Sequence, residues 1–220
     1  LGIETMGGVV SKLIHRNSTI PASATESFTT AVDGQRNVLI HVLQGERELV
    51  RDCRSLARFE LKDIEPMPAG LARIEVRFLI DANGILNVTA RDARTGKEQT
   101  VEVKPSYGLN EEQVEAMIRE SFEKAEEDMR ERKVREARVE ADNILAATEK
   151  AQRNEAWNAL DPEERASIES AKRELQSVYH GSDHRIINEK IEALNKATMA
   201  LAENMMNTAV RGALKGTKVE

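Results

Sequence analysis

Cysteine, aromatic residues and long apolar runs are scarce in this sequence of 220 residues. The single cysteine, Cys53, excludes an internal disulfide, and a chain of this size without one is typical of a reducing compartment, which favours the cytoplasm. Aromatic residues make up only 3%, too few for the stacking platforms that hold single-stranded nucleic acid. No apolar run approaches the roughly 20 residues of a membrane helix, and no signal-peptide pattern opens the chain. We therefore expect no nucleic-acid or membrane partner.

Hydrophobic and charged residues are abundant instead, at 40% and 32% of the chain. Such a hydrophobic share can fill one large core or two small ones. Up to Lys104 the chain carries 14 basic and 14 acidic residues, which leaves 18 basic and 24 acidic after it, so all of the net charge of −6 lies in the second part. The chain opens at Leu1 without an initiator Met, and we expect a piece of a longer protein.

From Leu1 to about Lys104 apolar residues recur every second position, which is the period of a half-buried strand. The segment 74–80 alternates apolar with mostly charged residues, and 86–90 and 101–103 continue the pattern. The segment 38–43 is apolar on both faces, which favours a central strand with one face along a groove. Asn83-Gly84 predicts a type I′ hairpin turn, because both residues adopt positive φ readily. This part is predicted to be antiparallel β.

After Pro105 the apolar period becomes helical. Asn110 followed by Gln113, and Asp161-Pro162 followed by Glu164, have the spacing of capping boxes and predict two helix starts. The expected apolar faces, including that of one last helix that runs through 187–205, are Val114, Met117, Ile118 and Phe122; Val134, Ala137, Ala141, Ile144, Leu145 and Thr148; Ile168, Ala171, Leu175 and Val178; and Ile187, Ile191, Leu194, Thr198, Leu201 and Met205. Four or five helices are predicted, the final three closing into a bundle.

Several blocks, in order along the chain, resemble the substrate-binding domain of the heat-shock protein 70 family. They include LGIETMGGV at 1–9, IHVLQGER at 40–47 and IDANGIL at 80–86. The resemblance extends to about Met205. It implies a β-sandwich that binds peptide, over residues 1–108, followed by an α-helical lid that ends in a helix bundle, over 109–216. The ATPase domain of the family is expected to be absent from this chain.

Two groups of blocks point to different branches of the family. DCRSLARF at 52–59, VKPSYGL at 103–109 and VRGALKG at 210–216 resemble HscA, the branch dedicated to iron–sulfur cluster assembly. GKEQ at 96–99 and GLNEE at 108–112 resemble DnaK, the general chaperone. The HscA-like interpretation is placed first and the DnaK-like one second.

The resemblance implies a groove for extended hydrophobic peptide between two loops, with Met6 and Ala31 arching over the ligand. Ala31 matches DnaK rather than HscA, which leaves the shape of the arch and the direction of the peptide open. Without the resemblance, the apolar members would be assigned to the core. The full set of expected groove residues is Ile3, Thr5, Met6, Phe28, Thr29, Ala31, Gln35, Val38 and Ile40, with Gln35 contacting the ligand backbone.

The resemblance also implies polar contacts between the lid and the outer β loops. Asp142 matches the lid acid, but Ala69 stands where its arginine partner is expected, so that latch cannot form. Asp33 and Lys150 offer an alternative pair, and exposed pairs contribute only about 0–1 kcal/mol. We therefore expect a lid that opens more readily than that of DnaK, or one that swaps onto a neighbouring copy.

For function, the resemblance implies a chaperone module that binds hydrophobic segments of unfolded or client proteins and is not itself an enzyme. ATP and Mg²⁺ would act in the missing domain of the parent ATPase, to which a J-domain co-chaperone would bind. The client of an HscA-like protein would be an iron–sulfur scaffold with a Leu-Pro-Pro-Val-Lys motif. A general folding chaperone in the stress response, or a structural or nucleotide-exchange relative, is the alternative.

Other chemistry has weaker support in the sequence. His180 and His184 flank Asp183 but lack a third well-placed ligand, so no metal site is predicted. Cys53 between charged neighbours is interpreted as a surface residue rather than a redox centre or cluster ligand. No nucleophile, base and orienting acid lie at spacings that indicate a hydrolase, and no phosphate-binding glycine loop is present. No catalytic residue is therefore assigned.

Overall fold

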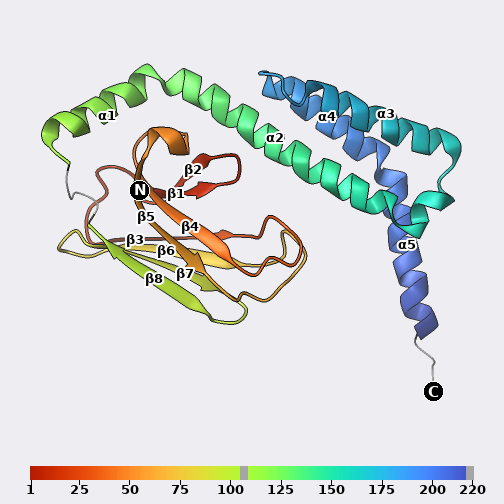
Figure 1. The fold of residues 1–220 in the computed structure, drawn as a ribbon, viewed down its shortest axis with the longest axis horizontal. Helices are drawn as coiled ribbons and strands as arrows, with labels where there is room; N and C mark the ends of the chain where they lie inside the picture. Colours follow the sequence, from red (N-terminus) through yellow and green to blue (C-terminus); the bar gives the residue numbers. More distant parts are fainter. Residues whose placement is uncertain (105–108, 217–220) are drawn as a thin grey trace. The chain divides into compact units, whose positions relative to one another are not determined.

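The computed structural model describes residues 1–104 and 109–216 (Figure 1). Contacts between residues divide the chain into two compact units, Leu1–Arg132 and Lys133–Glu220. We call these the β unit and the helical unit. The first unit takes in the helices up to Arg132 as well as all the strands.

Eight antiparallel strands form the two four-stranded sheets of the β unit (Figure 1). One sheet has the order β2-β1-β4-β5, with β1 (Gly2–Thr5), β2 (Val9–Lys12), β4 (Val38–Gln44) and β5 (Arg54–Leu61). The other has the order β3-β6-β7-β8, with β3 (Ala22–Phe28), β6 (Ile74–Ile80), β7 (Leu86–Asp92) and β8 (Glu98–Val103). A short 3₁₀ helix, η1 (Val50–Asp52), precedes β5. The predicted antiparallel sandwich is confirmed.

The core of the β unit lies between the two sheets and follows from the alternation in the sequence. In β6, buried residues at 74, 76, 78 and 80 alternate with exposed ones, so one face of the strand is wholly inside. Phe78 and Val88 are opposite each other on β6 and β7 and are fully buried. On the facing sheet, Ile3, Ile40 and Val42 belong to the same cluster. Burying a side chain of this size stabilises the fold by about 1.5–3 kcal/mol.

The hairpin between β6 and β7 has a different turn from the predicted type I′. Gly84 has a φ of +78°, but Asn83 is not among the residues with positive φ, so only one of the two positions is left-handed. Asp81 accounts for the difference, because its carboxylate accepts hydrogen bonds from the backbone N–H groups of Asn83 (2.8 Å) and Ile85 (2.9 Å). The carboxylate thus stabilises a longer loop in which glycine alone takes the positive φ.

Five α-helices follow the strands in the described part of the chain, as predicted (Figure 1). They are α1 (Glu111–Glu123), α2 (Ala125–Gln152), α3 (Pro162–Val178), α4 (His184–Ala197) and α5 (Met199–Gly216), with a 3₁₀ helix η2 (Glu155–Ala159) before α3. Both predicted capping boxes are present, at Asn110 with Gln113 and at Asp161 with Glu164. No described helix combines the length and the apolar composition that crossing a membrane would require.

The helical unit has its own core, built from the predicted faces of its helices. Its buried residues are Val134, Ala137, Ala141, Ala156, Leu160, Ile168, Ala171, Leu175, Ile187, Ile191, Leu194 and Leu201. Trp157 is partly buried and packs against this cluster. These contacts join α2, α3, α4 and α5 into one packed body.

One helical prediction was wrong. The segment predicted as one last helix forms two helices, since α4 ends at Ala197 and α5 begins at Met199. The Thr198 hydroxyl donates to the carbonyl of Leu194 (3.0 Å), a side-chain bond that competes with regular helical pairing. The predicted apolar face of α1 is not buried: Phe122 is 72% exposed, and none of the residues of that helix is buried.

Candidate peptide-binding groove

The sheet topology brings the predicted groove residues to one end of the sandwich. β1 runs antiparallel to β4, with Ile3 opposite Val42, so Thr5 at the end of β1 lies near the start of β4. β3 ends at Phe28, and the loop 29–37 leads directly from it to Val38 at the start of β4. Nine residues spread over 38 positions therefore gather where β1 and β3 end and β4 begins.

Burial at this end is graded from the core to the surface. Ile3 and Ile40 are each 3% exposed and are core residues. Phe28 and Val38 are partly buried and pack against the same core. Thr5 and Gln35 are half-buried. Met6 is 48% exposed, and Thr29 and Ala31 are also exposed. The predicted set thus has a buried apolar base and an exposed rim.

Hydrogen bonds within the loop 29–37 hold one side of the rim. Gln35 accepts a bond from the backbone N–H of Ala31 (3.1 Å) through Oε1 and donates to the carbonyl of Asn37 (2.7 Å) through Nε2. Its side chain therefore spans its own loop and fixes the backbone at Ala31. The expected contact of Gln35 with a ligand stays a prediction.

The loop between β5 and β6 supports the loop 29–37 from outside. The N–H of Gly34 donates to the carbonyl of Met67 (2.8 Å), and the N–H of Gly70 donates to the carbonyl of Thr30 (3.0 Å). Asp33 accepts from the N–H of Ala69 (2.9 Å). Asp33 and Ala69 were both considered above for contacts with the lid. In the structure they are joined to each other through the backbone N–H of Ala69, a bond that does not depend on the side chain at position 69.

On the other side of the rim, Met6 lies in a tight turn between β1 and β2. Gly7 and Gly8 have φ values of +82° and +68°, which residues with a Cβ rarely adopt. The Thr5 hydroxyl donates to the carbonyl of Val9 (3.2 Å), and the N–H of Gly8 donates to the carbonyl of Thr5 (3.2 Å). The turn is closed locally, and the Met6 side chain remains exposed.

A network of charged residues joins the start of α2 to the β strands within the β unit. Arg47 donates to Asp128 through Nε and through Nη2, the latter over 2.8 Å, and Asp128 is only 3% exposed. These hydrogen bonds lower the pKa of Asp128. Glu48 accepts from Lys12 (2.7 Å) and Arg132. Burial raises the pKa of Glu48, but the two cationic donors outweigh it, so its pKa is lowered.

A second polar chain, also missed by the sequence analysis, crosses three strands. The carboxylate of Glu4 on β1 lies 2.7 Å from Nδ1 of His41 on β4, and Nε2 of His41 lies 2.8 Å from the Oγ of Ser55 on β5. These contacts join residues 37 and 14 positions apart in the sequence, so spacing alone gave no sign that they meet.

The residues expected to hold the lid lie in different units. Asp142 in the helical unit accepts a hydrogen bond from the Tyr179 hydroxyl (2.9 Å). Burial and this carboxylate both raise the pKa of Tyr179. Asp33 in the β unit bonds to the backbone of Ala69, as described above. The pairing of Asp33 with Lys150 stays a prediction.

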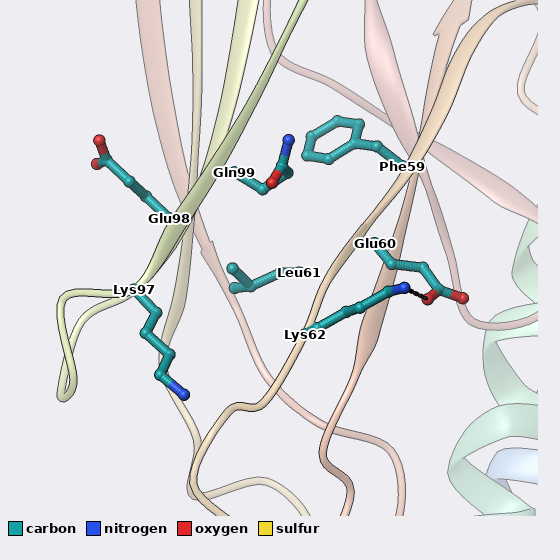
Figure 2. A pocket seen from close by; sticks show the side chains of 7 residues that line it. All are labelled: Phe59, Glu60, Leu61, Lys62, Lys97, Glu98 and Gln99. Carbon is teal, nitrogen blue, oxygen red and sulfur yellow. Dashed lines mark ion pairs between the residues drawn. The ribbon is translucent and has the colours of Figure 1, made fainter.

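The described residues of the β unit form several cavities, and the three considered next are not lined by the nine groove residues. The first, of about 660 Å³, lies between β5 and β8, and Figure 2 shows Phe59 and Gln99 on its two sides. Lys62 there pairs with Glu60 over 3.8 Å. The second, of about 280 Å³, lies between α1 and the start of the chain, and Gln44 lines it. The third, also of about 280 Å³, lies beside Met67.

Fold and site together define a class of protein. It has an antiparallel β-sandwich with a rim of hydrogen-bonded loops at one end, followed in the sequence by a unit of packed helices. A family model described as Hsp70 protein matches residues 1–207. The chain belongs to the Hsp70 family, as the resemblance of its sequence blocks predicted.

Relatives within the family carry the name "Chaperone protein HscA homolog", which supports the HscA-like branch. Those of Azoarcus sp. (strain BH72), Ralstonia pickettii (strain 12J) and Tolumonas auensis are 50%, 49% and 49% identical to this chain over all 220 residues. The chain spans about a third of these relatives, 35% of the first two and 36% of the third.

Proposed function

We propose that this chain is the peptide-binding module of an Hsp70 chaperone, which holds extended hydrophobic segments of client proteins. The observation that carries the proposal is the graded burial at one end of the sandwich. There, exposed Met6 and Ala31 stand on two separate loops, above a base that includes Ile3 and Ile40. A ligand placed between the two loops would bury Met6 and reach apolar side chains below.

Binding an extended peptide requires main-chain hydrogen bonds and a site for at least one apolar side chain. Loop backbones on both sides of the rim would supply the first, and Phe28 and Val38, which are only partly buried, would supply the second. Burying one ligand side chain the size of leucine contributes about 1.5–3 kcal/mol. We therefore expect affinity to be modest and to depend on several contacts at once.

Rigid loops favour such binding, because loops that are already ordered lose little entropy when a ligand arrives. The hydrogen bonds of Gln35 to its own loop, and those of Gly34 and Gly70 to the neighbouring loop, support this view. In this proposal Gln35 holds Ala31 in place and reaches the ligand backbone only if one of its present bonds is exchanged.

The client class we propose is an iron–sulfur scaffold protein with a Leu-Pro-Pro-Val-Lys motif, in line with the HscA name of the relatives. An ATPase domain and a J-domain co-chaperone would act elsewhere in the parent protein, since this chain spans about a third of those relatives. A general DnaK-type chaperone is the alternative that Ala31 favours, because this residue matches DnaK rather than HscA.

The test is a titration of the chain into two fluorescently labelled peptides, followed by anisotropy. One carries Leu-Pro-Pro-Val-Lys, and the other is a leucine-rich general ligand. We expect binding of both with a clear preference for the proline peptide. Met6→Ala should weaken binding about threefold to tenfold, because it removes most of one buried apolar contact. Met129→Ala is the matched control, since Met129 is 45% exposed in the same unit but lies on α2.

The outcomes separate the alternatives. Equal affinity for both peptides, or preference for the leucine-rich one, would replace the scaffold specialist with a general chaperone. Equal losses in Met6→Ala and Met129→Ala would show that the ligand does not lie at the rim. Binding of neither peptide would reject the peptide-binding proposal and leave a structural or nucleotide-exchange role.

A further inference from the structure

The strand that leads into the Met6 turn is held by its neighbour β4 over only part of its length. β1 pairs with β2 along all four of its residues, from Gly2 to Thr5. With β4 it pairs at Gly2 and Ile3 alone. Beyond Ile3 no backbone ladder fixes the distance between β1 and β4, although this distance sets how far Thr5 and Met6 stand from Val38 and Ile40.

The side chains of Glu4, His41 and Ser55 make the connection that the backbone lacks at this point. Glu4 is the first residue of β1 beyond the ladder, and its carboxylate lies 2.7 Å from Nδ1 of His41. A carboxylate can only accept, so Nδ1 carries the proton; in the neutral ring Nε2 then accepts from the Ser55 hydroxyl over 2.8 Å. We call these three residues the His41 clamp.

An irregularity in β5 brings Ser55 to the clamp. Between β4 and β5 the register shifts, so that Val42 is opposite Ala57 but Leu43 is opposite Ser55, which leaves Leu56 as an extra residue. In a regular ladder Ser55 would be opposite Gln44 and would point to the other face of the sheet. Bulges commonly redirect a side chain in this way. The His41 ring is buried, with 3% exposure, whereas its two partners Glu4 and Ser55 are exposed at the surface.

We infer that the His41 clamp positions the end of β1 and thereby sets the width of the peptide-binding rim. The inference rests on the proposed function. His41 lies next to Ile40 in the sequence, and Glu4 lies between Ile3 and Thr5. The clamp therefore connects the part of β4 that forms the base of the groove with the part of β1 that leads to the rim at Met6. Glu4, His41 and Ser55 are positioning residues, because they act on the ligand through Thr5 and Met6.

The test compares the affinity and the release rate of the better-bound peptide in Glu4→Ala, Ser55→Ala and Glu4→Gln. Loss of one such hydrogen bond should weaken binding about twofold to tenfold in the two alanine variants, mainly through faster release. Glu4→Gln should restore most of the affinity, because its amide oxygen still accepts from Nδ1–H. Glu98→Ala, an exposed strand glutamate of the other sheet, is the control and should bind as the unmodified chain does.

Nitrogen chemical shifts of the histidine ring report the clamp directly, since the chain has only four histidines. Both alanine variants should change the His41 signals, and all variants should keep a cooperative thermal transition. Unchanged peptide affinity in Glu4→Ala, together with an altered His41 signal, would overturn the inference. So would an equal loss of affinity in Glu98→Ala.

If the unmodified chain binds neither peptide, the proposed function fails. Hydrogen exchange then tests separately whether the His41 clamp positions β1. In that case faster exchange at the amides of Thr5 and Gly8 in Glu4→Ala would support positioning of β1 by the clamp. Unchanged exchange at these amides would overturn it.

Discussion

At the scale of single residues, Arg47, in the segment between β4 and η1, makes a heavily buried charged contact with Asp128 on α2. The Arg47 and Asp128 side chains are 14% and 5% exposed, whereas Arg51 and Glu131, which pair nearby over 2.7 Å, are 58% and 31% exposed. Removing one partner of a buried pair leaves the other charge buried without a partner, whereas the remaining charge of an exposed pair is solvated by water. The pair of Arg47 with Asp128 should therefore contribute more to the stability of the β unit than the pair of Arg51 with Glu131.

We expect Asp128→Ala to destabilise the β unit by about 2–3 kcal/mol, because Arg47 loses two charged hydrogen bonds and keeps only the longer contacts with Asp52 (3.6 Å) and Glu120 (4.0 Å). Glu131→Ala, the matched control, should cost less than about 1 kcal/mol. Denaturation by urea measures both changes. Equal losses of stability in the two variants would contradict the larger contribution expected of the buried pair.

The same pair gives a pH signature with a definite sign. The pKa of Asp128 is lowered in the folded chain by hydrogen bonds from Arg47, so its stabilising effect is complete above the ordinary carboxyl pKa of about 3.9 and is lost as pH falls through the lower folded value. The gap in stability between the unmodified chain and Asp128→Ala should therefore narrow below about pH 4. A gap that stays constant there would contradict the ion pair as the cause.

At the scale of elements, the start of α3 depends on a local arrangement that was visible in the sequence. The Asp161 carboxylate accepts from the N–H of Glu164 (2.7 Å), and the Glu164 side chain accepts from the N–H of Asp161 (3.1 Å). Pro162 occupies the first helical turn, where its missing N–H has no cost. The bonds thus satisfy backbone donors that have no partner within the helix.

Asp161→Ala should destabilise the helical unit by about 1 kcal/mol, the usual cost of losing an N-cap. Glu163→Ala, in the same exposed first turn but outside the capping box, should change stability by less than about 0.5 kcal/mol. Thermal denaturation followed by circular dichroism compares the two variants. A larger loss in Glu163→Ala would show that the helix dipole, and not the cap, dominates at this terminus.

At the scale of the whole molecule, the chain contains two separate hydrophobic cores. Leu86 is fully buried in the core of the β unit, and Leu194 is fully buried in that of the helical unit. Each core closes within its own unit, which is the usual mark of parts that could fold alone. The units should therefore respond separately to a defect in either core.

Leu86→Ala and Leu194→Ala make the same chemical change in the two cores. Each should destabilise its own unit by about 2–5 kcal/mol, because a buried leucine leaves a cavity when truncated. Hydrogen exchange resolved by mass spectrometry should show faster exchange in one unit and unchanged protection in the other. Equal acceleration throughout both units would show that the chain unfolds as one cooperative body.

Prediction from the sequence succeeded where the signal was local. Period-two alternation found the strand 74–80, and the spacing of Asp161 and Glu164 found a helix start, since each depends on neighbours within a few residues. Prediction failed where a side chain changed the local outcome, as Asp81 did in the hairpin and Thr198 did between α4 and α5. The groove residues were named through family resemblance, and their role in binding stays a prediction.

The sequence by itself determined most of the strands and helices, most of their buried faces and the family that the chain resembles, because these properties depend on short-range patterns. The division between α4 and α5 and the exposure of Phe122 in α1 were exceptions. Only the tertiary structure decided the His41 clamp and the contact of Arg47 with Asp128. Their partners are 37 and 81 residues apart, and no pattern in the sequence pairs them. They meet because sheet register, a bulge at Leu56 and the position of the first residues of α2 within the β unit place distant polar groups within hydrogen-bonding distance.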